Sequence, residues 1–578
     1  MPPALIPLVG AILLPLLPKR LRGFFFLAPP ALCLYLLTRL PQGSSATWEF
    51  LSYTLHPLVA DRLSLLFGSI FSIIVFIGGV YGLHLKDRFQ QTAALLYYAG
   101  AMGVTFAGDY LTLYAFWELM AVGSVVLIWA RRTEESSRAG GRYILVHLAG
   151  GVILLAGILL QIQNSGSLSI QSFLPGSGGT AAWLILIGFA LNAAVPPLHA
   201  WLPDAYPRGT VTGSVFLSAL TTKTAVYVLI RCYSGWEVLL WAGVIMSLYG
   251  VIYAILANDI RLILAYHIVS QVGFMVAGIG LGTEMAINGA AAHAFCHILY
   301  KALLFMGAGT VLYQTGHSRL TDLGGLSKRL PVVLILYMVG AVSISGLPLF
   351  NGFISKSMTI SAAEQAGIIP AFLLLELASV GTFLSVGLKL PYFTWYSSPK
   401  QGPSKEIEIN PAPKNMILGM SLAAAACFLL GVAPGLLYRF LPYPVHFQAY
   451  TPAHVVGALQ LLFFAGVVFF FLIPKLSPKP GFLIDTDCAY RMPAPLARLL
   501  FVKYVVSAFE NVQIGGNRLA AALARRSRNP VAFLSGFVGR PVDKTQAFDP
   551  DRQRPPIQVA ISLTLLFVVV MALWITLR

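Results

Sequence analysis

Long apolar segments recur along almost the whole chain. Each runs for roughly 17 to 25 residues, the length that crosses a bilayer as a helix, and polar residues gather in the connections between them. Apolar and polar residues do not alternate, so strands of a transmembrane barrel are not expected. The pattern predicts an all-α, polytopic membrane protein with about 14–16 transmembrane helices. The predicted spans are 3–17, 23–39, 60–84, 90–108, 110–130, 140–162, 180–200, 210–232, 236–257, 261–281, 286–313, 331–366, 369–396, 414–438, 453–474 and 557–577.

Proline and glycine interrupt two of these spans. The span 180–200 contains "VPPLH", and the span 331–366 contains "SGLPLFNG". Paired breaks at matching places in two halves of a chain are typical of transporters, because the freed carbonyls and helix ends can solvate an ion or water. The placement predicts two half-channels of about five helices each, over residues 90–232 and 236–396.

The rest of the chain is organised around these halves. We expect N-terminal transmembrane helices over 1–89, C-terminal transmembrane helices over 397–474 and a final anchor over 557–578. The intervening segment, 475–556, has apolar and basic residues at helical spacing and is interpreted as a cytoplasmic or amphipathic segment.

The charge of the chain supports a membrane topology. Hydrophobic residues make up 57% and charged residues 11%, with a formal net charge of +17. Lys and Arg crowd alternate connections such as "PKRLRG", "RRTEESSRAGGR" and "SRLTDLGGLSKR". This positive-inside pattern places the N-terminus outside, in a bacterial or archaeal-type inner (plasma) membrane, and accounts for the basic charge without nucleic acid. The five cysteines are scattered without CxxC spacing, so no disulfide framework, zinc site or iron–sulfur site is indicated.

Ionisable side chains inside predicted spans are the candidates for function, because they are costly at membrane depth. Glu118 lies near the middle of an otherwise apolar span, where a lone carboxylate must pair or be protonated; a structural hydrogen bond between helices is the alternative. Lys223 lies too deep for its amine to reach either surface, and it either exchanges protons or forms a permanent ion pair.

Three basic residues share one helix face in "HAFCHILYK". His293, His297 and Lys301 recur at i, i+4 and i+8, a spacing that favours a proton relay. A metal site is a weaker alternative, since two histidines at this spacing can chelate but no third ligand is evident. Lys356 follows the second break, and Lys389 lies nearer the inner interface, where a lysine can also extend its amine to the surface.

Several motifs together resemble one known family. The segments "FWELM", "PLHAWLPDAYP", "TTKTAVY", "NDIRLILAYHIVSQVGF", "HILYKALLFMGAG" and "SGLPLFNGFISK" are similar to the proton-conducting antiporter-like family. That family includes subunits of Mrp-type sodium/proton antiporters and membrane-arm subunits of respiratory complex I and membrane-bound hydrogenases. The wording "LAYHIVSQVGF" and the chain length are most similar to the D-type subunit of Mrp antiporters. The resemblance implies about fourteen helices, two inverted five-helix repeats and proton movement along buried lysines, histidines and a glutamate.

The resemblance also assigns roles to particular positions. It implies that Glu118 is the glutamate of the fifth helix, that Lys223 links the half-channels and that Lys356 lies at the exit side. His293, His297 and Lys301 match the family's basic stripe, and His267 is a further candidate.

One family position departs from the pattern. The lysine expected seven residues before His199 is replaced by Asn192. Asn192 can order water but cannot carry a charge. Glu118 would then lack its cationic partner, so the first half conducts through ordered water, borrows another cation such as Lys223, or is inactive.

These observations predict a proton-translocating subunit of a multisubunit monovalent cation (Na⁺)/H⁺ antiporter, working with other subunits. The alternatives are a membrane-arm subunit of a redox-driven complex, of the NADH:quinone oxidoreductase or hydrogenase kind, and a non-transporting scaffold subunit. We expect no metal, no cofactor and no nucleic-acid partner, because no nucleotide-binding or metal motif is present. Enzymatic activity would belong to a whole redox complex and not to this chain alone.

Overall fold

The computed structural model describes residues 1–51, 53–397, 411–479, 483–527 and 557–576, with the single residues 481 and 539. The chain forms two compact units, Met1–Asp487 and Cys488–Arg578. Within the described ranges, eleven helices are long and apolar enough to cross a membrane. Shorter apolar helices cover Leu5–Leu16, Gly179–Asn192, Pro331–Ser345 and Ile557–Met571. The predicted all-α membrane fold is confirmed.

The first unit begins with helices that flank the two halves. They are α1 (Leu5–Leu13), the 3₁₀ turn η1 (Leu14–Leu16), α2 (Lys19–Arg39) and α3 (Arg62–Tyr81). Between α2 and α3 lies an antiparallel hairpin, β1 (Ser45–Phe50) and β2 (Tyr53–Val59), where the span pattern implied only a connection. The segments "SATWEF" and "YTLHPLV" are rich in β-branched and aromatic residues, which favour strands.

The first half contains α4 to α10. Its elements are α4 (Arg88–Phe106), α5 (Tyr110–Trp129), α6 (Glu134–Ser165), α7 (Gly179–Asn192), α8 (Trp201–Ala205), η2 (Tyr206–Arg208), α9 (Gly213–Ala219) and α10 (Thr221–Cys232). The break predicted in 180–200 is present, because α7 ends at Asn192. The span predicted over 210–232 is also divided, between α9 and α10 at Leu220, which the sequence pattern did not indicate.

The next helices cover the predicted second half, residues 236–396. They are α11 (Glu237–Leu256), α12 (Ile260–Leu281), α13 (Glu284–Thr315), α14 (Pro331–Ser345), α15 (Asn351–Gln365), α16 (Ile369–Thr382) and the π-helical segments η3 (Phe383–Lys389) and η4 (Tyr392–Tyr396). The predicted break in 331–366 separates α14 from α15, where Gly346 takes a φ of 81° that favours glycine.

The remaining elements follow the two halves. In the first unit they are α17 (Lys414–Val432), α18 (Gly435–Tyr438) and α19 (Pro452–Leu476). The second unit contains α20 (Cys488–Arg491), α21 (Ala494–Leu500), the π-helical η5 (Phe501–Val506), α22 (Ser507–Ser527) and α25 (Ile557–Thr576). The helix α22 lies within the segment 475–556 that we expected to be amphipathic. The connection 398–410 and most of 528–556 lie outside the described residues.

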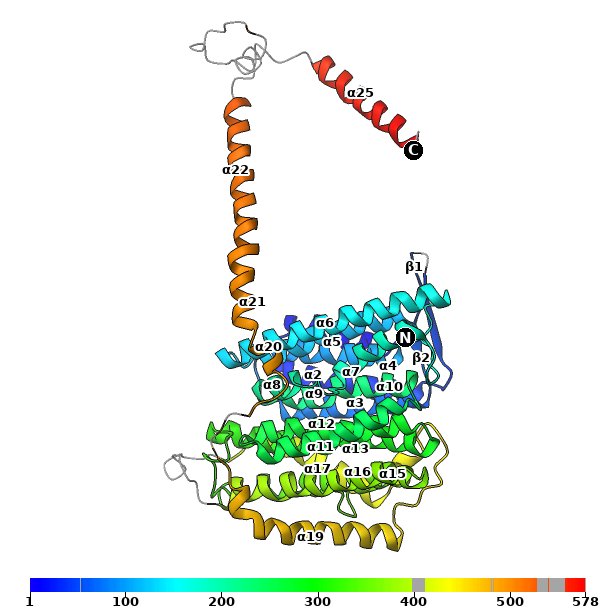
Figure 1. Cartoon of the computed structure of the whole chain (residues 1–578), viewed down its shortest axis with the longest axis vertical. Helices are drawn as coiled ribbons and strands as arrows, with labels where there is room; N and C mark the ends of the chain where they lie inside the picture. Colours follow the sequence, from blue (N-terminus) through cyan, green and yellow to red (C-terminus); the bar gives the residue numbers. More distant parts are fainter. Residues whose placement is uncertain are drawn as a thin grey trace. The chain divides into compact units, whose positions relative to one another are not determined.

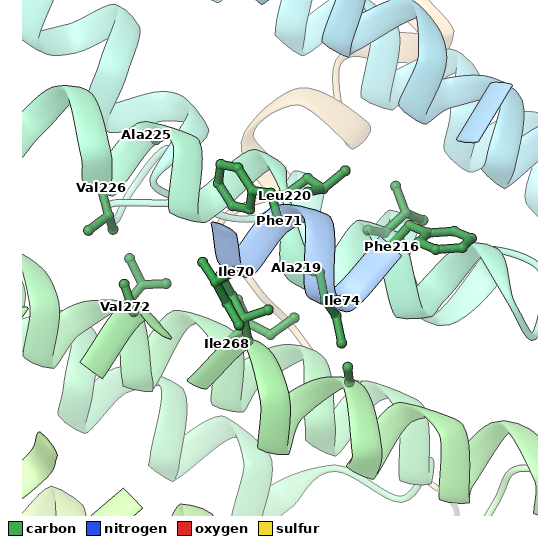
Figure 2. Close-up of a cluster of buried hydrophobic side chains, with 14 of the residues drawn as sticks. Ile70, Phe71, Ile74, Phe216, Ala219, Leu220, Ala225, Val226, Ile268 and Val272 are labelled. Carbon is green, nitrogen blue, oxygen red and sulfur yellow. The ribbon is translucent and has the colours of Figure 1, made fainter. Parts of the chain in front are cut away.

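The two halves stack against each other in the first unit (Figure 1). Helix α12 of the second half packs on α10, and α13 packs on α9 and on α3. Figure 2 shows the apolar contact that results: Val226 of α10 faces Val272 of α12, and Ile70 of α3 lies beside Ile268. Buried hydrophobic side chains therefore join α3, α10 and α12.

Candidate functional site

Lys223 lies immediately after the interruption between α9 and α10. Its side chain is completely buried. Its Nζ donates to the carbonyl oxygen of Ser218 at 2.7 Å and to Oγ1 of Thr222 at 3.0 Å. A buried ammonium needs hydrogen-bond acceptors, and an intact helix would use most of its carbonyls internally. The interruption therefore provides a carbonyl that can accept from Lys223.

The basic residues of α13 form the centre of the site. His293, His297 and Lys301 are all completely buried. His293 Nδ1 lies 3.1 Å from Oγ of Ser355, and its Nε2 lies 3.4 Å from the hydroxyl of Tyr300. Both ring nitrogens of His297 and the Nζ of Lys301 have no hydrogen-bond partner in the part of the chain that the structure describes.

These basic groups act on one another through their charges. His297 interacts electrostatically with Lys223, Lys301, His293 and Lys356. Because the groups share a low-dielectric interior, a proton on one raises the free energy of placing a proton on another. Lys223 and Lys356 therefore belong to one electrostatically coupled cluster with the stripe on α13, and the use of these residues as a proton path stays a prediction.

Lys356 lies on α15, after the break of the second half. Its Nζ donates to the carbonyl oxygen of Ile344, near the end of α14, at 2.8 Å, and to Oγ of Ser379 at 3.2 Å. The ammonium also lies 5.1 Å from the ring centre of Phe274. Glu376 on α16 interacts with it electrostatically. This lysine thus has a helix C-terminus, an aromatic face and a carboxylate as favourable neighbours.

The two additional candidates behave differently. His267 is buried beside the cluster, its Nε2 lies 2.6 Å from Oγ of Ser385, and it interacts electrostatically with Lys301 and Lys356. Lys389 instead donates to the carbonyl oxygens of Ile255 and Ala257, at 2.5 and 2.9 Å. It caps the C-terminus of α11, which is an ordinary structural use of a lysine.

Glu118 has no cationic partner among the residues described. Its Oε1 is buried without a hydrogen bond. The carboxylate lies directly against the Cα of Gly151 on α6, so closely that any side chain there would collide with it. Asn192, the last residue of α7, is 2% exposed. The first half therefore has a half-buried acid, Glu118, and a buried amide, Asn192, without a lysine between them.

Sequence reasoning missed three ionisable residues near the axis. Glu376 in "FLLLELASV" and His147 in "YILVHLAGG" each stand in an apolar run, which is the signal that identified Glu118. The third, Asp485, lies in a polar segment after α19 and had no such signal. It accepts hydrogen bonds from the hydroxyls of Tyr249 and Tyr266, at 2.5 and 2.6 Å.

Asp485 attaches the segment after α19 to both halves. Its Oδ1 lies 3.2 Å from Nε2 of His199, which belongs to the break of the first half. Burial alone would raise the pKa of this carboxyl, but the contacts with His199, Tyr249 and Tyr266 outweigh it and hold the pKa below its usual range. The group is therefore ionised wherever the fold is intact near neutral pH.

The helical centre of the chain matches a known family. The family described as "NADH:quinone oxidoreductase/Mrp antiporter, TM" covers residues 107–385. An uncharacterized protein of Methanocaldococcus jannaschii is 30% identical over 394 residues, which span 64% of this chain and 80% of that protein. The chain belongs to this family. It is a multi-pass, antiporter-like membrane subunit.

Other relatives come from two kinds of complex. Hydrogenase-4 component B of Escherichia coli is 27% identical, covering 72% of this chain and 68% of that protein. The A-type subunit of the Na⁺/H⁺ antiporter of Alkalihalophilus pseudofirmus is 29% identical, covering 75% of this chain and 60% of that protein. The family resemblance is confirmed at this level, and the similarity to the D-type subunit in particular stays a prediction.

Solved structures show the same fold. A chain of the membrane-bound sulfane sulfur reductase, an archaeal respiratory complex, matches with a TM-score of 0.70 at 22% identity and covers 99% of both chains. A chain of the Mrp complex from Dietzia matches with a TM-score of 0.67 at 23% identity, covering 81% of this chain and 98% of that one. Both are multisubunit assemblies, in agreement with the predicted partnership with other subunits.

The contact between Glu118 and Gly151 leads to a first prediction. Gly151→Ala places a methyl group where the carboxylate lies, so the flexible end of the Glu118 side chain must move away from α6. We expect little change in melting temperature, because that movement relieves the collision, and a reduced proton flux in the assembled complex, because Glu118 leaves this face. Gly141→Ala is the matched control, because nothing lies within 4 Å of a side chain at that position of the same helix. Equal behaviour of the two variants would contradict the contact.

The attachment by Asp485 leads to a second prediction. Asp485→Asn removes the charge that faces His199, which weakens the attachment of this segment. The neighbouring Cys488 should then react faster with a maleimide. It is the only described cysteine that is not buried. Glu284→Gln, at an exposed acid, is the control.

The same contact has a defined pH dependence. A carboxyl whose pKa is lowered in the folded state stabilises the fold above its ordinary pKa of about 3.9 and loses that contribution as the pH falls. Labelling of the unaltered chain should therefore stay constant between about pH 5 and 8 after correction for thiol ionisation. An increase within that range would contradict the attachment.

Proposed function

We propose that this chain is the proton-translocating subunit of a multisubunit monovalent cation (Na⁺)/H⁺ antiporter, in an inner membrane with its N-terminus outside. The observation that carries the proposal is the buried basic cluster that joins Lys223, the α13 stripe and Lys356. Such a cluster is costly to keep for stability alone, because apolar side chains would pack there without any desolvation penalty.

The basic groups of the cluster form a connected series along the axis, which supports proton movement from one end to the other. Lys223 stands at the junction of the halves, His297 and Lys301 have free polar atoms, and Lys356 lies beside Glu376. A proton that arrives at one end of the cluster repels the protons on the other basic groups. This repulsion favours release of a proton at the far end. Glu376 also interacts with the exposed Glu364, so the acidic pair supports an exit toward the outer side.

A second candidate function is favoured by one observation. The match to the sulfane sulfur reductase chain extends over 99% of this chain, whereas the match to the Mrp chain extends over 81%. A redox-driven complex would use the same axis, with electron transfer in a partner protein as the energy source. The two candidates share the proton path and differ in what drives it.

The path itself is tested by removing its lysines. In the purified complex in liposomes, Lys223→Ala and Lys356→Ala should each lower proton flux by about tenfold or more, because each removes a proton-carrying group. Lys389→Met is the matched control: it removes an equally buried lysine that caps α11, so it should lower the melting temperature but keep the flux per assembled complex. Unchanged flux in both alanine variants would leave the chain as a scaffold subunit.

The driving force is tested with the same liposomes. An imposed Na⁺ gradient should drive proton movement if the complex is an antiporter. Proton movement that requires an electron donor and acceptor, and ignores the Na⁺ gradient, would favour the redox-driven alternative. The subunit composition of the purified complex gives an independent answer.

A further inference from the structure

The two halves keep a common register that the sequence similarity between them does not reveal. Helices α6 and α13 each have 32 residues, begin after a threonine N-cap and end at a left-handed glycine. The number of residues from Thr133 to Thr283 equals the number from Gly166 to Gly316. The same interval also separates two isolated β-bridges, Asp109 with Ser169 around α5 and α6, and Asp259 with Arg319 around α12 and α13. Positions on α6 therefore have direct counterparts on α13.

This register gives the first half its own member of the basic stripe. The interval that relates the caps places His147 at the position of His297. Tyr143 takes the position of His293, and Gly151 takes that of Lys301. One of the stripe positions thus keeps a basic, titratable side chain in the first half, and that side chain is His147.

His147 is buried and only partly satisfied. It is 3% exposed, and its Nε2 has no hydrogen-bond partner within the described ranges. The side chain forms a hydrogen bond with Asn192 across the α6–α7 contact. Its ring centre lies 4.1 Å from that of Tyr143 and 4.6 Å from that of Trp201. A ring that is held by an amide on one side and has a free nitrogen can exchange a proton without turning.

The acid of the first half lies on the same face of α6. The Glu118 carboxylate packs against Gly151, which is one helical turn from His147. The absence of a side chain at Gly151 lets the carboxylate approach this face. Glu118 from α5, His147 from α6 and Asn192 from α7 therefore converge on the place where the family resemblance implies a glutamate–lysine pair.

Hydroxyl groups of α6 and α10 extend from this place toward Lys223. The hydroxyl of Tyr143 lies 2.7 Å from Oγ of Ser124 and also interacts with the side chain of Thr221. Thr221 is followed by Thr222, whose Oγ1 accepts the hydrogen bond from Lys223. Both threonines begin α10, directly after the interruption at Leu220. Hydroxyls both donate and accept, so such a series can pass a proton along.

We propose that His147 is the proton carrier of the first half and takes the place of the lysine that position 192 lacks. The inference rests on the proposed proton-translocating function. In the forward step the O–H bond of the Glu118 carboxyl breaks as an N–H bond forms on His147, which leaves a carboxylate beside an imidazolium. The imidazolium then passes its proton through the hydroxyls of Tyr143, Thr221 and Thr222 to a neutral Lys223 amine, so that an N–H bond breaks on His147 as one forms on Lys223, and the imidazole becomes neutral again. Asn192 orients the ring and carries no proton.

The test exchanges the two proton carriers. His147→Asn keeps a polar side chain but cannot titrate, and should lower proton flux through the complex in liposomes by about tenfold or more. Adding Asn192→Lys to that variant should restore flux to within about threefold of the unaltered protein. Asn192→Lys alone should change flux by less than about threefold. The restored variant should also work best at a higher pH, because an amine titrates at a higher pH than an imidazole.

Controls distinguish a proton-carrying role of His147 from a packing role, and a failure of this proposal from a failure of the proposed function. His446→Asn changes an exposed histidine and should have no effect. Assembly on native gels and melting temperature are measured for every variant, and His147→Gln replaces His147→Asn if the latter fails to assemble. Normal flux in His147→Asn, or no rescue by Asn192→Lys, would overturn the proposal while Lys223→Ala still blocks flux. If Lys223→Ala also leaves flux normal, the proposed function itself fails.

Discussion

Placing basic side chains at membrane depth is the constraint on which this structure depends. A buried ammonium loses its water and must find acceptors inside the protein. In each described case in which a buried lysine makes a hydrogen bond, the acceptors include a carbonyl at a helix end or interruption. Ser218 serves Lys223, Ile344 serves Lys356, and Ile255 with Ala257 serve Lys389. The broken helices are therefore the means by which the chain keeps charge in its interior.

The two halves use this principle with different partners. In the second half Lys356 has Glu376 nearby, so acid and base face each other beside the break. In the first half Glu118 has no cation among the described residues, and the residue at the break is an amide. The common register of α6 and α13 indicates how the first half can work without a lysine at position 192. A basic side chain, His147, is present on the neighbouring helix α6. The repeat thus preserves the combination of an acid and a base while it moves the base by one helix.

Polar groups and an apolar cluster both lie where the halves meet. Side chains of α3, α10 and α12 meet in a buried hydrophobic cluster (Figure 2). The polar route consists of hydroxyls at the start of α10 on one side and the histidines of α13 on the other. Asp485 holds the segment after α19 across α11, α12 and the first break, so that both halves meet one common anchor.

The sequence by itself determined the membrane class, the predicted spans in outline, two of the three helix interruptions and the candidates Glu118, Asn192, Lys223, His293, His297, Lys301 and Lys356. These follow from apolar length, from proline and glycine, and from ionisable residues in apolar runs, all of which are local signals. The tertiary structure alone separated Lys389, which caps a helix, from the lysines of the axis. It also decided that Leu220 interrupts a helix that has no proline there, and that Asp485, His147 and Glu376 approach the site. Those outcomes depend on which helices pack together. His147 and Glu376 stand in apolar runs that mark them as candidates, but only contacts between residues far apart in the chain place them at the site.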